Sequence, residues 1–258
     1  MNPATRIYSI VQTFSATNTN ATIQSIWEKY LAEQSAPPIS EDDVIIAAQA
    51  LMAEVRSMEN KLRSIEVPQD LYADCVNRLR TAFSPTQLAV PWQGHKEIIE
   101  KQATQLALRW THWALSKFDE NDIDESSLQD LVTSLAAQEV LLKTTALPLG
   151  LREILERQTR ALRRAIQLYR ITGAEPVRKV VTDAFGEFGT ASTTLAAEVE
   201  QSSSSVKDVL AKGMQLIGKT AEIADKGSKI VKFGKDIYQL GSTGYQLGTS
   251  LLQSLPSV

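Results

Sequence analysis

Apolar residues recur along most of this chain at intervals of three and four positions, and stretches in which apolar and polar residues alternate are rare. That spacing places apolar side chains on one face of an α-helix, whereas alternation is typical of a β-strand. The pattern therefore predicts an all-α protein: a multi-helix bundle with a long C-terminal amphipathic region that carries glycine heptads. We expect the bundle over residues 1–175 and the C-terminal helical region over residues 176–258.

Residues that start and stop helices predict boundaries in the first half of the chain. Ser40 and Asp43 have the spacing of a capping pair, in which each side chain satisfies a free N–H group of the first turn. We expect a helix to follow this pair and to run to about Ile65. A second long helix is expected from Trp92 to Phe118.

Proline and glycine mark the boundaries in the second half. Pro148 is suited to open a helix, and Gly173 is suited to end it as a C-terminal cap. No proline occurs between Val177 and Leu255, which permits a very long helix or a helical hairpin. The serine run at residues 202–205 is the expected break, and the heptads would occupy residues 206–254.

Composition and charge exclude several classes of function. The 258 residues include 27 Lys and Arg against 30 Asp and Glu, so the chain lacks the basic excess of most nucleic-acid-binding proteins. The one cysteine, Cys75, and the two histidines, His95 and His112, are too few for a structural zinc site. No phosphate-binding glycine loop or nucleophile elbow occurs. We therefore expect a non-enzymatic protein with no cofactor and no metal.

A seven-residue glycine repeat stands out near the C-terminus. Glycine occupies positions 227, 234, 241 and 248, and the same frame extends back to Val206. On a helix the first, fourth and fifth positions of this frame form one face, so the glycines lie in the middle of an apolar face. A glycine inside a helix costs about 0.5–1 kcal/mol relative to alanine, so we expect a neighbouring surface to approach the bare backbone. The expected association face comprises Gly227, Gly234, Gly241, Gly244, Gly248, Ile230, Ile237, Tyr238 and Tyr245.

The polar side of the same region carries lysines, and from Ile237 to Val258 no residue is charged. A lysine-bearing amphipathic stretch followed by an uncharged end is typical of a segment that binds an anionic membrane. Packing against the chain's own bundle is the alternative. The tetrapeptide Tyr-Gln-Leu-Gly occurs at 238–241 and 245–248, which also leaves an extended hairpin or stacked β-segment open. The lysines expected to contact a membrane or another anion are Lys219, Lys226, Lys229, Lys232 and Lys235.

Charge also alternates in blocks: residues 119–142 carry acids and no bases, and residues 143–180 are rich in arginine. Arg157, Arg160 and Arg164 share one face of the helix expected there. They suit either an acidic partner, which the preceding block could supply within the chain, or the phosphates of a nucleic acid or lipid.

Three aromatic residues, Trp110, His112 and Trp113, lie close together on the helix expected over 92–118. Aromatic side chains at such spacing usually anchor helix packing, so we expect core or interface residues with a histidine at the edge. A ligand or RNA contact is the alternative.

These observations favour a helical interaction protein that acts through a self-associating or membrane-active C-terminal segment, including as a membrane-permeabilising effector. One alternative is a soluble adaptor whose C-terminal helix packs on its own bundle or on a partner helix. A second is an RNA-binding helical protein. Because no apolar run is long enough for a transmembrane helix and no secretory signal is evident, we expect a cytoplasmic protein that can associate peripherally with a membrane. The expected partners are another protein or further copies of the chain.

Overall fold

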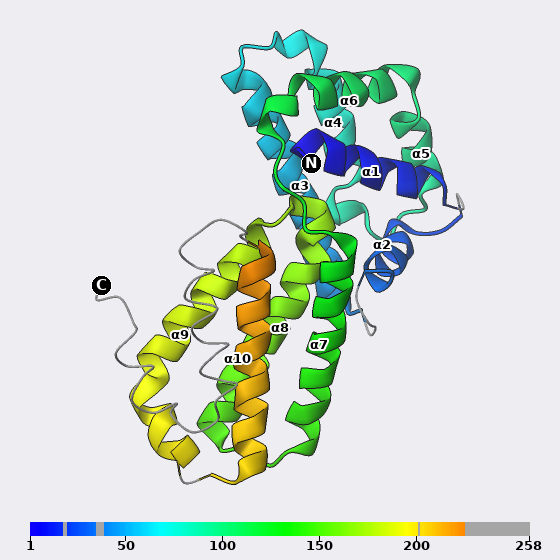
Figure 1. Cartoon of the computed structure of the whole chain (residues 1–258). Helices are drawn as coiled ribbons and strands as arrows, with labels where there is room; N and C mark the ends of the chain where they lie inside the picture. Colours follow the sequence, from blue (N-terminus) through cyan, green and yellow to red (C-terminus); the bar gives the residue numbers. More distant parts are fainter. Residues whose placement is uncertain (18–19, 35–38, 201, 225–258) are drawn as a thin grey trace. The chain divides into compact units, whose positions relative to one another are not determined.

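The computed structural model describes residues 1–17, 20–34, 39–200 and 202–224 (Figure 1). This part of the chain is all-α, which confirms the predicted fold class; its β-type pairing is limited to an isolated bridge between Thr22 and Pro91. The α-helices are α1 (Pro3–Ser15), α2 (Ile23–Ala32), α3 (Glu41–Ser64), α4 (Ala73–Ala82), α5 (Gln93–Ile99), α6 (Gln102–Ala114), α7 (Glu125–Thr144), α8 (Leu149–Thr172), α9 (Glu175–Glu200) and α10 (Ser204–Ala224). Short 3₁₀ helices are η1 (Gln69–Leu71), η2 (Pro85–Gln87) and η3 (Ser116–Phe118).

The chain divides into two compact units. Unit 1 contains residues 1–122 and 167–173, and unit 2 contains residues 123–166 together with the chain from 174 onward. Helix α8 contributes to both units, because its last residues belong to unit 1. The sequence pattern predicted a single bundle over residues 1–175, and it held no signal that one continuous helix is shared between two units.

An aromatic cluster fills the core of unit 1. The ring of Phe14 on α1 makes edge-to-face contacts with Trp27, Phe83 and Trp92, with ring centroids 5.0, 5.2 and 5.4 Å apart. Such geometry places the positive edge of one ring against the negative face of the next. Helix α1 packs against both α3 and α6, so its apolar stripe forms part of the centre of this unit.

The capping pair predicted at Ser40 and Asp43 is present. The Ser40 hydroxyl accepts the Asp43 N–H at 3.2 Å, and the Asp43 carboxylate accepts the Ser40 N–H at 2.9 Å. Both bonds satisfy donors that the first helical turn would otherwise leave free. Helix α3 starts directly after Ser40 and ends at Ser64, next to the predicted end at Ile65.

The prediction of one helix from Trp92 to Phe118 is wrong. The structure has α5, then a break at Glu100 and Lys101, then α6 and η3. The physical reason lies in two polar side chains just after the break: the Gln105 amide donates to the Ile99 carbonyl at 3.0 Å, and the Thr104 hydroxyl donates to the Ile98 carbonyl at 3.3 Å. They satisfy carbonyls that a continuing helix would have bonded itself, so α5 can end there.

Unit 2 is built from α7, most of α8, α9 and α10. Helix α10 packs against α7 and α9, and Figure 1 shows these helices side by side. Helix α8 begins directly after Pro148, and Gly173 follows its end with φ +79°, the left-handed conformation expected of a glycine cap. Helix α9 ends at Glu200 and α10 begins at Ser204, beside the break expected at 202–205. Among the described residues, no helix combines the length and apolarity needed to cross a bilayer.

Candidate interaction surfaces

Helix α10 carries the first described part of the heptad frame, and its face packs into unit 2. Residues at the first, fourth and fifth positions are buried between Val206 and Ala224, with Ile223 only partly covered. The buried residues of these positions are Val206, Val209, Leu210, Gly213, Leu216, Ile217, Thr220 and Ala224. The face deduced from the repeat is therefore buried where the structure describes it, although burial extends beyond this face to Met214, Gly218 and Ala221 at second and sixth positions.

Gly213 occupies the first position of the frame and lies in close contact with two other helices. A Cβ atom added to it would lie 2.9 Å from Cδ2 of Leu155 on α8 and 3.2 Å from Nε2 of Gln138 on α7. The same Gln138 amide donates to the backbone carbonyl of Val209 at 3.3 Å, so α7 binds the α10 backbone directly. Close approach of this kind is what the glycine register predicted.

The remaining residues of the expected association face begin at Gly227. They lie outside the described residues, as do Lys226, Lys229, Lys232 and Lys235. Lys219 is described: its Nζ atom lies 3.4 Å from an Asp130 carboxylate oxygen on α7. Of the lysines expected to contact an anion, this one therefore has a partner within unit 2.

The arginine face of α8 contains paired and unpaired side chains, all of them exposed. Arg157 pairs with Glu187 on α9, whereas Arg160 and Arg164 form no ion pair within the described residues. Arg163 on the neighbouring side donates from Nε to Glu139 of α7 at 2.8 Å. The acidic block thus supplies a partner to the arginine helix, but through Arg163 rather than through the face predicted from Arg157, Arg160 and Arg164.

The three aromatic residues of α6 have three different environments. Trp110 is half-buried against the core of unit 1, and Nδ1 of His112 forms a 2.6 Å hydrogen bond with the Thr5 hydroxyl. Trp113 is 71% exposed, and Leu106 on the same helix is 53% exposed. Of the expected core or interface residues, Trp110 packs against the core, whereas Trp113 does not, because α6 presents its other face, with Leu108 and Thr111, to the core.

A buried ion cluster in unit 1 was not expected from the sequence. Arg6 on α1 is 2% exposed, and it pairs with buried Glu54 on α3 and with Glu120, whose Oε2 lies 3.2 Å from Nη1 of Arg6. Burial raises the pKa of Glu54, and the Arg6 charge opposes that effect. Gly173 completes the cluster, since a Cβ there would lie 2.7 Å from both Nη1 of Arg6 and Oε2 of Glu120. The partners are far apart in sequence, so no local motif signalled them.

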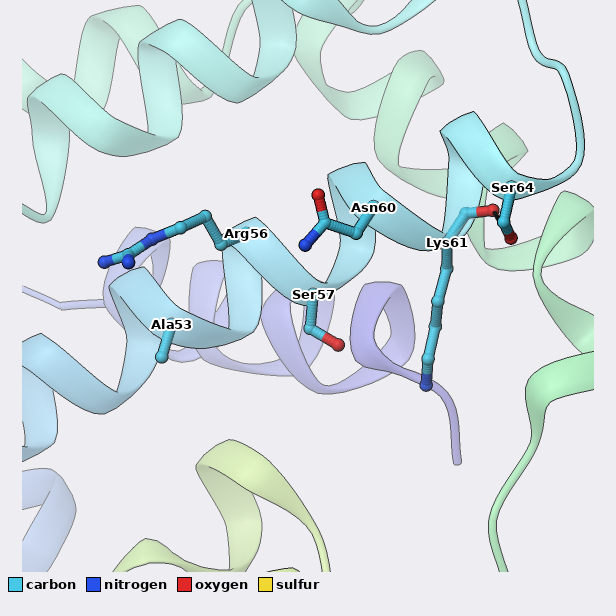
Figure 2. Close-up of a pocket in the computed structure, with 6 residues that line it drawn as sticks. All are labelled: Ala53, Arg56, Ser57, Asn60, Lys61 and Ser64. Carbon is cyan, nitrogen blue, oxygen red and sulfur yellow. Dashed lines mark hydrogen bonds between the residues drawn. The ribbon is translucent and has the colours of Figure 1, made fainter.

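A shallow hollow of about 420 Å³ runs along the outer side of α3 (Figure 2). In Figure 2 the Ser57 and Lys61 side chains leave the helix on one side, and Arg56 and Asn60 leave it on another, so the polar groups do not converge on one point. Lys61 is also engaged by Glu120 at 3.6 Å. The lining contains no acid–base pair or nucleophile with an adjacent base, so it offers no catalytic arrangement. The lining residues are Ala53, Arg56, Ser57, Asn60, Lys61 and Ser64.

Cys75 has the environment of a structural cysteine. Its Sγ atom lies 3.8 Å from the Thr104 carbonyl oxygen, and burial raises the pKa of the thiol to about 12. We expect the native protein to react with iodoacetamide about a thousandfold more slowly than the urea-unfolded chain, because its thiolate fraction is smaller by that factor. Mass spectrometry of timed samples measures both rates. Fast labelling of the native protein would contradict the assignment.

His95 stacks on Trp92 with ring centroids 6.3 Å apart, and its Nδ1 atom is buried without a hydrogen-bond partner in the described residues. Burial lowers the pKa of His95, so as the pH falls the unfolded chain binds a proton at this residue at a higher pH than the folded chain does. Stability from this group is therefore complete above pH 6.5 and is lost as pH falls through the lowered value.

We expect His95→Gln to reduce the pH dependence of unfolding between about pH 7.5 and 5, where one proton contributes a slope of up to about 1.4 kcal/mol per pH unit. Urea unfolding monitored by tryptophan fluorescence measures the slope. His112→Gln, at the exposed histidine, is the control, and an equal reduction in both variants would contradict the prediction.

The described residues contain no group of His, Cys, Asp and Glu side chains that could hold a metal ion. No protein-family model, curated protein or solved structure matches the chain.

Proposed function

We propose that this chain is a non-enzymatic helical interaction protein that acts through its C-terminal heptads, by associating with further copies of itself or with an anionic membrane. The supporting observation is the packing of Gly213, where a frame glycine brings the α10 backbone against side chains of two neighbouring helices. The same frame continues in the sequence at Gly227, Gly234, Gly241 and Gly248, after the last residue of α10. On this proposal the later glycines make the same kind of close contact with a partner surface.

The test compares the full chain with a chain that ends at Ala224. This end point retains all of α10, including its last carbonyl, which accepts a 3.1 Å hydrogen bond from Nε of Arg178. Sedimentation equilibrium is expected to give a larger, concentration-dependent mass for the full chain alone. Dye leakage from vesicles of phosphatidylcholine with phosphatidylserine, at low salt, tests in parallel whether the chain acts on an anionic membrane.

Substitutions within the full chain distinguish the effect of packing at the glycine face from the effect of shortening the chain. Gly234→Leu with Gly241→Leu places bulk on the association face, whereas Thr243→Leu places a leucine at a third position of the frame, on the opposite face. The proposal predicts that the double variant loses oligomers or leakage and that the control retains them. If neither the truncation nor the double glycine variant changes the mass in solution or the leakage, the proposal is wrong.

An adaptor function is the second candidate, and a specific observation favours it. Within the described residues the heptad face of α10 is already covered by helices of its own chain. In an adaptor, the remaining heptads would bind a partner helix without changing the oligomeric state. A monomeric full chain that causes no leakage is the expected result for this function.

A further inference from the structure

We propose that the outer face of α6, formed by Leu106, Arg109 and Trp113, is a docking site for an acidic amphipathic helix of a partner protein. These three residues are separated by three and four positions, so they form one stripe along the helix. All three are exposed, and the opposite face of α6, which includes Leu108, supplies the core of unit 1. The site is distant in sequence from the C-terminal heptads and does not depend on their association.

The exposed side chains have the composition of an interface centre. Trp113 is 71% exposed and Leu106 is 53% exposed, although each would gain by leaving water. Trp and Arg are the residues most enriched among those that dominate binding energy at protein interfaces. Trp113 follows Leu106 by seven positions, which places the two residues about 10 Å apart along the helix axis, or about two turns. A facing helix offers apolar side chains at the same interval.

Charge on this face specifies the acidic character of the partner. From Lys101 to Lys117 the charged residues are all basic, and Arg109 lies between the two apolar side chains. Arg109 is exposed and has no ion-pair partner in the described part of the chain. A carboxylate on the facing helix, between its own apolar residues, would pair with this guanidinium at the centre of the contact.

The surrounding residues favour a discrete protein partner over a membrane or a nucleic acid. Acidic residues flank the stripe in sequence, with Glu97 and Glu100 before α6 and Asp119 and Asp122 after it. Charges of both signs near an apolar centre are typical of protein interfaces, whereas a surface that binds an anionic bilayer or a nucleic acid is usually basic throughout. Leu106 also offers no planar face on which a base could stack.

The test titrates the full chain with a Trp-free synthetic helical peptide of about 18 residues, carrying leucines seven apart and glutamates between them. The indole N–H signal of Trp113 in NMR spectra, assigned with Trp113→Phe, is expected to shift and saturate. A peptide with glutamine in place of glutamate is expected to bind about tenfold more weakly, and Arg109→Gln should weaken the original peptide similarly. Trp113→Ala should weaken binding about thirtyfold.

Leu149→Ala is the matched control, because Leu149 is a 72% exposed apolar residue of unit 2 and its loss should leave binding unchanged. Equal binding of the two peptides, no effect of Trp113→Ala, or no saturable shift would each overturn the proposal. So would a Trp113 signal that responds to phosphatidylserine vesicles or single-stranded RNA and not to the peptide. A Trp113→Ala chain of lower mass in solution would assign the face to contacts between copies and would also overturn it.

Discussion

Replacing Arg6 with methionine is expected to lower the free energy of unfolding of unit 1 by about 3–5 kcal/mol, because it leaves Glu54 buried without its cation. Arg6 is 2% exposed, and its Nε donates to a Glu54 carboxylate oxygen at 2.6 Å. Glu120 loses less, since it is partly exposed and lies near Lys61. Urea unfolding followed by tryptophan fluorescence measures the change, since Trp27, Trp92, Trp110 and Trp113, the four tryptophans of the chain, belong to unit 1.

The stability lost in Arg6→Met should depend on pH, in a direction that the environment of Glu54 determines. Burial already raises the pKa of Glu54 with Arg6 present, and removing the cation raises it further. A raised pKa in the folded state contributes stability that is complete below the ordinary value, about 4.3, and is lost as pH rises through the folded value. Arg6→Met is therefore expected to be more damaging at pH 8 than at pH 5.

A double variant distinguishes an unpaired charge from lost packing. Arg6→Met with Glu54→Leu removes both charges and keeps apolar volume in the core, so it should recover a large part of the stability lost in Arg6→Met. Recovery should be greatest at high pH, where the lone carboxylate of the single variant is ionised. A single variant that loses less than about 1 kcal/mol with no pH dependence would contradict this account.

Local signals in the sequence predicted those parts of the fold that local chemistry determines. Ser40 with Asp43 marked the start of α3, and Gly173 marked the end of α8, because a capping bond or a left-handed residue involves only near neighbours. Hydrophobic periodicity predicted the buried face of α10 for the same reason, since the spacing of apolar residues fixes which side of a helix can leave water.

The features that were not predicted depend on contacts that neither a capping motif nor apolar spacing encodes. The break between α5 and α6 rests on Gln105 and Thr104 satisfying carbonyls of the preceding helix, and nothing in that stretch distinguishes them from ordinary surface residues. The exposure of Trp113 follows from which side of α6 meets α1 and α4. Periodicity identifies an apolar face, but a helix with apolar residues on two sides needs its neighbours to decide which side is buried.

Replacing Gly213 with leucine is expected to destabilise unit 2 by about 1–3 kcal/mol through overpacking. The first added carbon would already lie 2.9 Å from Leu155 Cδ2, and the rest of the side chain would extend into the contact between α10 and its neighbours. The Gln138 amide that donates to Val209 would also be displaced, which leaves a buried polar group without a partner. Thermal unfolding followed by circular dichroism, together with hydrogen exchange of α7 and α10, measures the effect.

Gly213→Ala and Lys212→Leu are the matched comparisons for this test. Alanine gains about 1 kcal/mol of helix propensity over glycine. The two atoms nearest to its methyl group are ends of side chains that can shift, so the free energy of unfolding of Gly213→Ala should stay within about 1 kcal/mol of that of the unsubstituted protein. Lys212 is the exposed neighbour, where leucine meets solvent and should change little. If leucine at position 213 is as stable as alanine there, the small residue is not required for close approach. The same inference for Gly234 and Gly241 would then lose its support.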